Sequence, residues 1–234
     1  MLPAHVRLLP GAVAALLLLA LAPAPARASG PYLVDDAAIT PAGTGQVETW
    51  GSIAGRGHVY QLVPATTLRT IPFLEWSLAF DSGRLDGEAA RGLTFQAKAL
   101  IGPEAQAPGD LAFAVSAAVR GSLEGAGTTD ALVNGIVTLM AADWLLLHGN
   151  LGYGRDFEGR SEALAWGVRA EATLIAERLS ANAEIFGASD TSPGFQLGLR
   201  PTVRDGTLDI ELVYSRNLGG EAASWATIGF ALRF

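Results

Sequence analysis

The chain has 234 residues, half of them hydrophobic, and its 23 Asp and Glu against 16 Lys and Arg give a formal net charge of -7. This acidic balance argues against nucleic acid as a partner, because phosphate binding needs clustered basic side chains. The chain has no cysteine, which excludes disulfides, zinc–thiolate sites, iron–sulfur clusters and cysteine nucleophiles. With His5, His58 and His148 as its only histidines, we expect no metal site and no cofactor.

Residues 1–28 have the features of a secretory signal peptide. Arg7 supplies a positive start, and Ala12 to Ala22 is an apolar run that is too short to cross a bilayer as a helix. Ala26-Arg27-Ala28 has the small residues that flank a cleavage site. We therefore expect an exported protein whose residues 29–43 form an extended N-terminal periplasmic segment.

Beyond residue 43 the sequence alternates between apolar and polar side chains, which is typical of β-strands with two different faces. Ile228, Phe230 and Leu232, for example, occupy every second position of the final stretch. The pattern predicts strands at about residues 44–56, 58–69, 73–82, 91–102, 110–121, 131–141, 144–155, 163–174, 179–188, 194–203, 208–216 and 224–234. No apolar run there is long enough for a membrane helix. Residues 44–234 are therefore predicted to form an all-β, antiparallel, transmembrane up-and-down β-barrel of about 12 strands, with ten strands as the alternative.

The polar face of these strands carries their charged side chains, as the interior of a membrane barrel should. A lipid-facing Arg or Lys at the bilayer midplane would cost about 2–4 kcal/mol. The residues predicted to line the lumen, and so a solute path, are Glu75, Lys98, Arg120, His148, Arg169, Glu171, Glu184, Arg200, Asp209 and Glu211.

Aromatic residues lie near strand ends on the apolar face, where interfacial girdles are expected. They are Trp76, Phe80, Phe95, Phe113, Tyr153, Trp166, Phe195, Tyr214 and Phe234. The chain also stops on an alternating strand that ends in Phe234, which resembles the recognition signal of bacterial outer-membrane barrels. A soluble periplasmic or secreted β-protein remains the alternative, since a sandwich alternates too.

Connections between the strands should be short on the periplasmic side and mostly longer on the external side. The longer loops are expected near residues 83–90, 122–130, 156–162, 189–193 and 217–223. The external turn at 55–57 is an exception because it is tight, and the periplasmic turn at 103–109 is an exception because it is long.

The opening of the exported chain adds a family resemblance. Pro31-Tyr32-Leu33-Val34-Asp35-Asp36-Ala37, followed by Ala42-Gly43-Thr44-Gly45-Gln46-Val47-Glu48-Thr49, resembles the start of a proteobacterial outer-membrane β-barrel family. That family is described as transporters or as related to the MetA pathway of phenol degradation. The chain departs from it at Ala37-Ala38, where a more polar pair is usual. The resemblance implies a barrel transporter and assigns no functional residue.

Two constellations in the predicted lumen could instead carry chemistry. His148 lacks a serine at the spacing that a barrel-embedded lipase would need. Asp209 and Glu211 share one strand face, as the acid–base pair of a membrane protease could, but facing Arg and Lys side chains make ion pairs the simpler explanation. Asp35-Asp36 could bind a cation, although adjacent acids in an extended tail are more often solvated.

The predicted function is therefore that of a non-enzymatic outer-membrane channel for small solutes with a charged lumen. The alternatives are a barrel-embedded lipid-modifying or proteolytic enzyme and a structural barrel whose lumen is filled by side chains. The expected partners are outer-membrane lipid and lipopolysaccharide, the barrel-assembly machinery during biogenesis and an unidentified small solute, and a monomer is favoured.

Strand register can also be predicted from the apolar residues alone, because antiparallel partners have a constant sum of residue numbers. Pairing the outward-facing leucines that flank the turn at 175–178 places Arg169 opposite Glu184. The same reasoning at the turn 204–207 places Arg200 opposite Glu211. Opposite charges on facing positions stabilise a ladder by about 0.2–1 kcal/mol, so both pairs should brace the lumen.

Overall fold

The computed structural model describes residues 30–55, 57–85, 88–124, 128–204, 206–219 and 223–234. The predicted signal peptide, residues 1–28, lies outside the described residues. Within the described ranges, no helix has the length and apolar character that a membrane-crossing helix requires.

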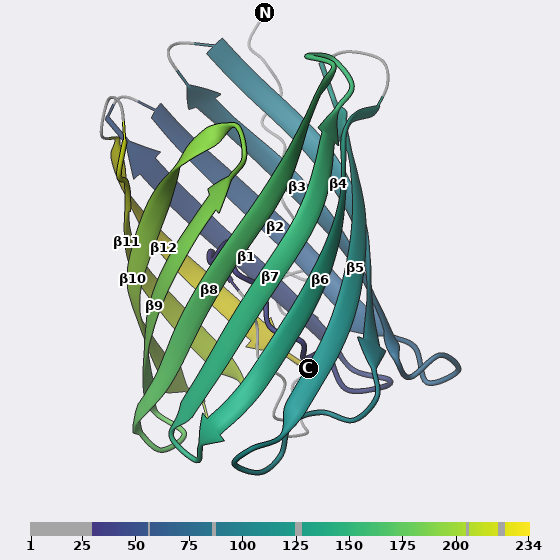
Figure 1. Ribbon diagram of the computed structural model, residues 1–234, viewed down its shortest axis with the longest axis vertical. Helices are drawn as coiled ribbons and strands as arrows, with labels where there is room; N and C mark the ends of the chain where they lie inside the picture. Colours follow the sequence, from purple (N-terminus) through teal and green to yellow (C-terminus); the bar gives the residue numbers. More distant parts are fainter. Residues whose placement is uncertain (1–29, 56, 86–87, 125–127, 205, 220–222) are drawn as a thin grey trace, which may run out of the picture.

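The described residues form twelve antiparallel strands that close into one barrel, and each strand pairs with its neighbours in the sequence (Figure 1). The strands are β1 (Gly45–Ala54), β2 (Gly57–Thr67), β3 (Leu74–Leu85), β4 (Glu88–Ile101), β5 (Leu111–Ser122), β6 (Thr128–Ala142), β7 (Leu145–Asp156), β8 (Ser161–Ile175), β9 (Leu179–Ala188), β10 (Thr191–Val203), β11 (Leu208–Asn217) and β12 (Ser224–Arg233). The predicted all-β up-and-down barrel is confirmed with twelve strands, and the ten-strand alternative is wrong.

The barrel closes where the first and last strands meet. β1 and β12 pair from Gln46↔Arg233 to Ile53↔Ala226. Beyond that ladder, the Gly45 amide donates to the Phe234 carbonyl at 2.9 Å, and the Phe234 amide donates to the Gly45 carbonyl at 3.0 Å. Because the alternating pattern continues to the last residue, the final strand has enough length to complete the ring and leave no open sheet edge.

The inner face of the barrel wall is polar and its outer face is apolar, as expected of a protein in apolar surroundings. Along β11, Asp209 and Glu211 are almost fully buried inside the barrel, while Leu212 and Tyr214 on the other face are exposed. A soluble β-protein would bury its apolar face and expose its polar one. Such a large exposed apolar surface is rare in soluble monomers, so the outer face disfavours the soluble alternative.

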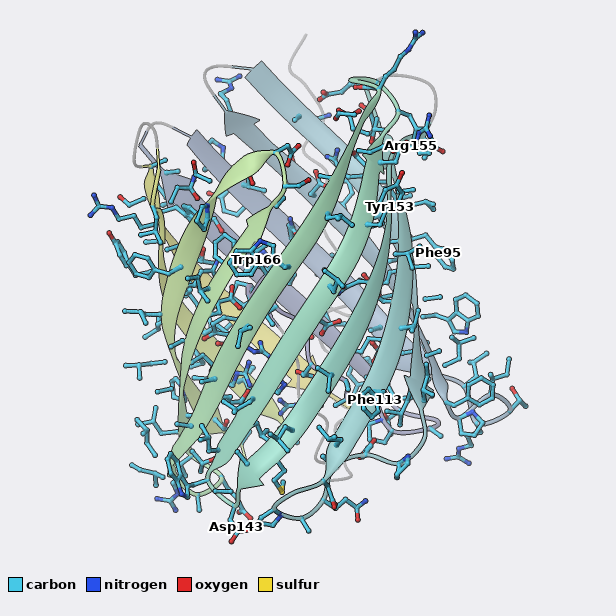
Figure 2. The ribbon with its side chains drawn as sticks, in the orientation of Figure 1. Phe95, Phe113, Asp143, Tyr153, Arg155 and Trp166 are labelled. Carbon is cyan, nitrogen blue, oxygen red and sulfur yellow. The ribbon has the colours of Figure 1, made fainter. Side chains whose placement is uncertain are left out.

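Some outward-facing side chains lie toward the two ends of the barrel. Figure 2 shows Tyr153 and Arg155 nearer the upper end, and Phe113 nearer the lower end that carries Asp143, whereas Phe95 and Trp166 lie closer to mid-height. Phe95 stacks on Trp76 with ring centroids 5.5 Å apart. Tyr153 and Phe113 have positions that suit the girdles flanking the apolar band of a membrane barrel.

The connections differ from the predicted alternation of short and long loops. At the upper end, β4, β6, β8 and β10 all begin before the predicted position, so much of each expected loop is strand. The two predicted exceptions are confirmed, because the longest connection, residues 102–110, lies at the lower end and the connection between β1 and β2 is tight. The difference arises because a hairpin ladder can continue past the apolar band, where the sequence no longer needs to alternate.

Candidate functional site

The interior of the barrel is occupied by the N-terminal segment, residues 30–44. Figure 1 shows this purple segment inside the ring of strands. The segment contributes the buried residues Tyr32, Val34, Asp36, Ala37, Ile39 and Thr40. We expected residues 29–43 to extend into the periplasm, and the structure differs for their described part, residues 30–43. The physical reason is that the lumen wall offers partners for both the apolar side chains and the acids of the segment.

Side chains of the wall hold the backbone of the segment. The Glu184 carboxylate on β9 accepts from the Leu33 and Val34 amides at 2.9 and 3.1 Å. The Asn150 side chain on β7 accepts from the Asp35 amide at 2.7 Å and donates to the Asp35 carbonyl at 2.9 Å. A buried backbone outside a sheet needs such partners, and these side chains supply them.

Two further contacts continue this series toward the lower end. The Ala37 amide donates to Thr138 Oγ1 at 2.9 Å, and the Thr40 amide donates to Glu75 Oε2 at 2.7 Å. Ala37 also packs with the wall residue Ile136 in a small apolar cluster. The segment is therefore bound by strands from several sides of the barrel.

The two adjacent acids of the segment pair with wall cations. Lys98 Nζ on β4 lies 3.0 Å from Asp35 Oδ1, and Arg169 Nη2 on β8 lies 3.1 Å from Asp36 Oδ2. Asp36 and Arg169 are both nearly inaccessible to solvent. Removing one partner of such a pair is strongly destabilising unless the remaining charge has a second partner nearby. The expectation that Asp35-Asp36 is a solvated pair is thus wrong.

Tyr32 and Val34 fit against glycines of the wall. A Cβ on Gly198 of β10 would lie 2.0 Å from Tyr32 Oη, and a Cβ on Gly167 of β8 would lie 2.4 Å from Val34 Cγ2. A side chain at either position would therefore require the side chain of Tyr32 or Val34 to move. The Tyr32 ring also lies 5.1 Å from the Arg169 guanidinium carbon, a favourable cation–π geometry.

The wall also carries ion pairs of its own beside the segment, where the Arg200 guanidinium carbon lies 5.6 Å from the centroid of the Tyr32 ring. Arg200 binds Glu211 and also Glu171, the latter at 3.1 Å. Arg233 binds Asp209. The prediction that the inward carboxylates are neutralised by basic side chains is confirmed for Asp209 and Glu211, which favours the structural interpretation of this carboxylate pair over an acid–base one.

Both predicted register pairs are confirmed. Arg169 is the direct ladder partner of Glu184. The β10–β11 register, which pairs Leu199 with Leu212, sets Arg200 opposite Glu211.

All the residues predicted to line the lumen face inward, and all but Arg120 are buried. The buried ones are Glu75, Lys98, His148, Arg169, Glu171, Glu184, Arg200, Asp209 and Glu211. Arg120 is half-buried nearer the upper end, 2.8 Å from Asp81 and 3.7 Å from Asp130. His148 Nδ1 lies 2.9 Å from Thr138 Oγ1. The role of these residues in a solute path stays a prediction.

The sequence reasoning missed the segment itself as part of the site. One available signal was its composition, since Tyr32, Leu33, Val34 and Ile39 are unusual in a solvated tail. The glycines at 167 and 198 on otherwise polar inward faces were a second signal, because they leave room for something else.

A family model described as "Uncharacterised conserved protein UCP029691" matches residues 15–234. The chain belongs to this family. The description does not name the phenol-degradation family that the opening residues resemble, so that more specific assignment stays a prediction. A comparison with curated proteins gives no match.

The chain is also similar to solved outer-membrane barrels, at identities that show the fold alone. The KdgM porin in complex with disordered oligogalacturonate has 8% identity and a TM-score of 0.58, covering 81% of this chain and 99% of that chain. The NanC porin has 10% identity and a TM-score of 0.59, covering 80% and 98%. Omp33 of Acinetobacter baumannii has 10% identity and a TM-score of 0.50, covering 82% and 98%.

Proposed function

We propose that the protein is an outer-membrane channel for small solutes and that residues 30–44 close it. The apolar outer face suits lipid, and the fold shared with the KdgM and NanC porins supports a place in the outer membrane. Export would use the signal peptide at residues 1–28, and insertion would use the barrel-assembly machinery. The polar lumen supports passage of solutes through the barrel rather than catalysis.

The observation that carries the closing role is that two bases of the wall have acids as ladder partners but bind the segment instead. Glu75 is the direct ladder partner of Lys98, and Glu184 is the direct ladder partner of Arg169. In the structure all four side chains bind the segment. When the segment leaves, each base faces an acid across its ladder. Opening therefore leaves no wall cation without a nearby partner, which avoids the main cost of breaking buried pairs.

The attachment of the segment also suits a gate. The segment joins β1 directly at Gly45 and has no cysteine to fix it covalently. Its last turn contains Gly43, with φ of +84°. A Cβ there would lie 2.3 Å from Arg69 Nε. Because glycine adopts this conformation without a steric penalty, Gly43 provides a pivot at the base of the segment.

Conductance of a reversibly tethered barrel tests the proposal. A Cβ at position 167 lies close enough to Val34 for a disulfide, whose Cβ atoms are about 3.8 Å apart. We expect the mature Val34→Cys/Gly167→Cys variant to conduct in planar bilayers when reduced and to stop conducting when oxidised. Each single-cysteine variant is the matched control, because its conductance should be the same with and without the oxidant.

The rival function is a structural barrel with a filled lumen, which the occupied interior favours. A mature variant that lacks residues 30–43 separates the two functions. If this variant and the reduced double-cysteine variant both fold but pass no current, the structural function is right and the channel is wrong. The resemblance to a phenol-degradation family makes small aromatic compounds one class of solute to include in flux assays.

A further inference from the structure

A cavity of about 290 Å³ lies in the lumen beside the N-terminal segment. Its wall includes Trp50 of β1, Gln61 of β2, Gln196 of β10 and Trp225 of β12. The segment contributes Leu33, together with Pro31. The cavity extends toward the β1–β2 turn at the upper end.

The chemistry of this cavity differs from that of the rest of the lumen. Among the described residues that line it, none is Asp, Glu, Lys or Arg, and the ring of His58 lies on the outer face with Ile53 and Tyr60. Leu33 is 59% exposed although it lies inside the barrel. An apolar surface without charges favours a neutral ligand, because a charged one would lose hydration without gaining a counter-ion.

Gln196 offers a hydrogen-bond acceptor that the described protein leaves without a partner. Its side chain is only 2% exposed, and its Oε1 atom accepts no hydrogen bond from any described residue. Its direct ladder partner Ser215 has a buried Oγ that likewise lacks a described partner. Buried polar atoms are normally hydrogen-bonded, so a ligand hydroxyl would satisfy Gln196 Oε1 if the amide, which lines the cavity, turned toward it.

The two tryptophans give the cavity apolar ring surfaces. Trp50 lies across the ladder from Gly229, which has no side chain to cover it. Trp225 is the direct ladder partner of Ser215, on the same inward face as Gln196. Aromatic faces with a few well-placed polar groups are typical of small-molecule sites.

We propose that this cavity is a binding site for a neutral solute that combines a flat ring face with hydroxyl donors. The ring face lies against Trp50 or Trp225, a hydroxyl group donates to Gln196 Oε1, and Leu33 forms the floor. Sugars and phenols share this chemistry. The identity of the ligand as a transported solute rests on the proposed channel function, whereas binding itself does not.

Isothermal titration calorimetry on the folded mature protein in detergent tests the site. The probes are maltose for neutral sugars, phenol for aromatic alcohols, and galacturonate as a charged sugar. We expect maltose or phenol to bind, and the one that binds more tightly identifies the source. Galacturonate should bind at least about tenfold more weakly than the preferred probe, because the cavity has no counter-ion.

Two variants connect the binding to the cavity. Gln196→Met keeps the size of the side chain but removes the acceptor, and Trp225→Ala removes a ring face. Gln196→Met should weaken binding of the preferred probe by about tenfold or more, since an unmet ligand hydroxyl discriminates strongly. Trp225→Ala should also weaken it, because the ligand ring loses an aromatic face. Trp166→Ala, on the outer face, is the matched control and should bind normally. Heat-modifiable mobility in gels verifies that each variant is folded.

Absence of binding by both neutral probes, equal binding of galacturonate, or normal binding by the folded Gln196→Met and Trp225→Ala variants would overturn the site. The oxidised Val34→Cys/Gly167→Cys variant separates this result from the channel proposal. Its lumen is closed, yet it should still bind the preferred probe. If the barrel binds the probe but never conducts, the binding site is supported and the channel function is contradicted.

Discussion

Arg169 and Glu184 face each other directly across the β8–β9 ladder, yet each binds a different residue of the N-terminal segment. Arg169 reaches Asp36 at 3.1 Å, and Glu184 accepts from the Val34 amide at 3.1 Å. The segment is thus inserted between two groups that the wall places as partners. The balance between the two arrangements should set how easily the lumen opens.

Neutralising Asp36 should favour the open arrangement. Asp36→Asn weakens the bond to Arg169, which can turn to Glu184 instead, so we expect the closed state to lose about 1–3 kcal/mol. Because about 1.4 kcal/mol corresponds to a tenfold change in an equilibrium constant, the ratio of open to closed channels in single-channel recordings should rise by about fivefold to about a hundredfold. The melting temperature of the barrel should change little.

Asp143→Asn is the matched control for that experiment. Asp143 is an exposed acid on the turn between β6 and β7, and its neutralisation removes the same charge without touching the segment. Equal open fractions in the two variants would contradict a role for the Asp36–Arg169 pair in closure.

Filling the space at Gly198 should expel the N-terminal segment. Gly198→Ala places a Cβ 2.0 Å from Tyr32 Oη, and the flexible tyrosine can move more readily than the wall can. We expect faster labelling of a Val34→Cys reporter by a water-soluble maleimide. Gly154→Ala is the control, because its Cβ would be 3.8 Å or more from its neighbours, and it should leave the labelling rate unchanged.

Deleting Phe234 should impair barrel closure. The deletion removes both hydrogen bonds between Phe234 and Gly45, each worth about 0.5–1.5 kcal/mol, and the aromatic end of the last strand. The yield of folded protein in the outer-membrane fraction should fall. Phe234→Ala keeps the backbone bonds, so comparison of the two variants separates the ring from the ladder. Normal yields of folded protein from both variants would contradict a role for Phe234 in assembly.

Unboiled mature protein in detergent should migrate differently in gels from boiled protein. The closed ladder of β1 and β12 leaves no edge from which unfolding can begin, so the barrel should resist detergent at room temperature. Identical mobilities, together with solubility in the absence of detergent, would contradict the membrane-barrel interpretation of the outer face.

The strands and their register could be predicted because both depend on local alternation. Pairing Leu174 with Leu179 set Arg169 opposite Glu184 correctly, although an irregularity next to the turn pairs Leu179 with Ile175 instead. The strand extensions at the upper end could not be predicted in this way. β4 begins at Glu88, because its hydrogen-bonded ladder continues beyond the apolar band, where the side chains no longer need to alternate between apolar and polar.

The place of the N-terminal segment could not be predicted for a different reason. Its residues form no regular element, so no period indicates which side faces a neighbour. Its partners are also far away in the sequence, as Val34 and Glu184 illustrate at a separation of 150 residues. Only the complete ring brings these groups together, and a pattern read along one strand cannot show that.

The charges of the wall have a consequence for the ion selectivity of the open pore. Among the buried inward side chains of the described barrel, acids outnumber bases. The acids are Glu48, Glu75, Glu171, Glu184, Asp209 and Glu211, and the bases are Lys98, Arg169, Arg200 and Arg233. Withdrawal of the segment takes its own acids away but leaves this excess on the wall. When the salt concentration differs across a bilayer, the reversal potential should therefore lie closer to the equilibrium potential of the cation than to that of the anion. The passage of neutral solutes should not depend on this wall charge.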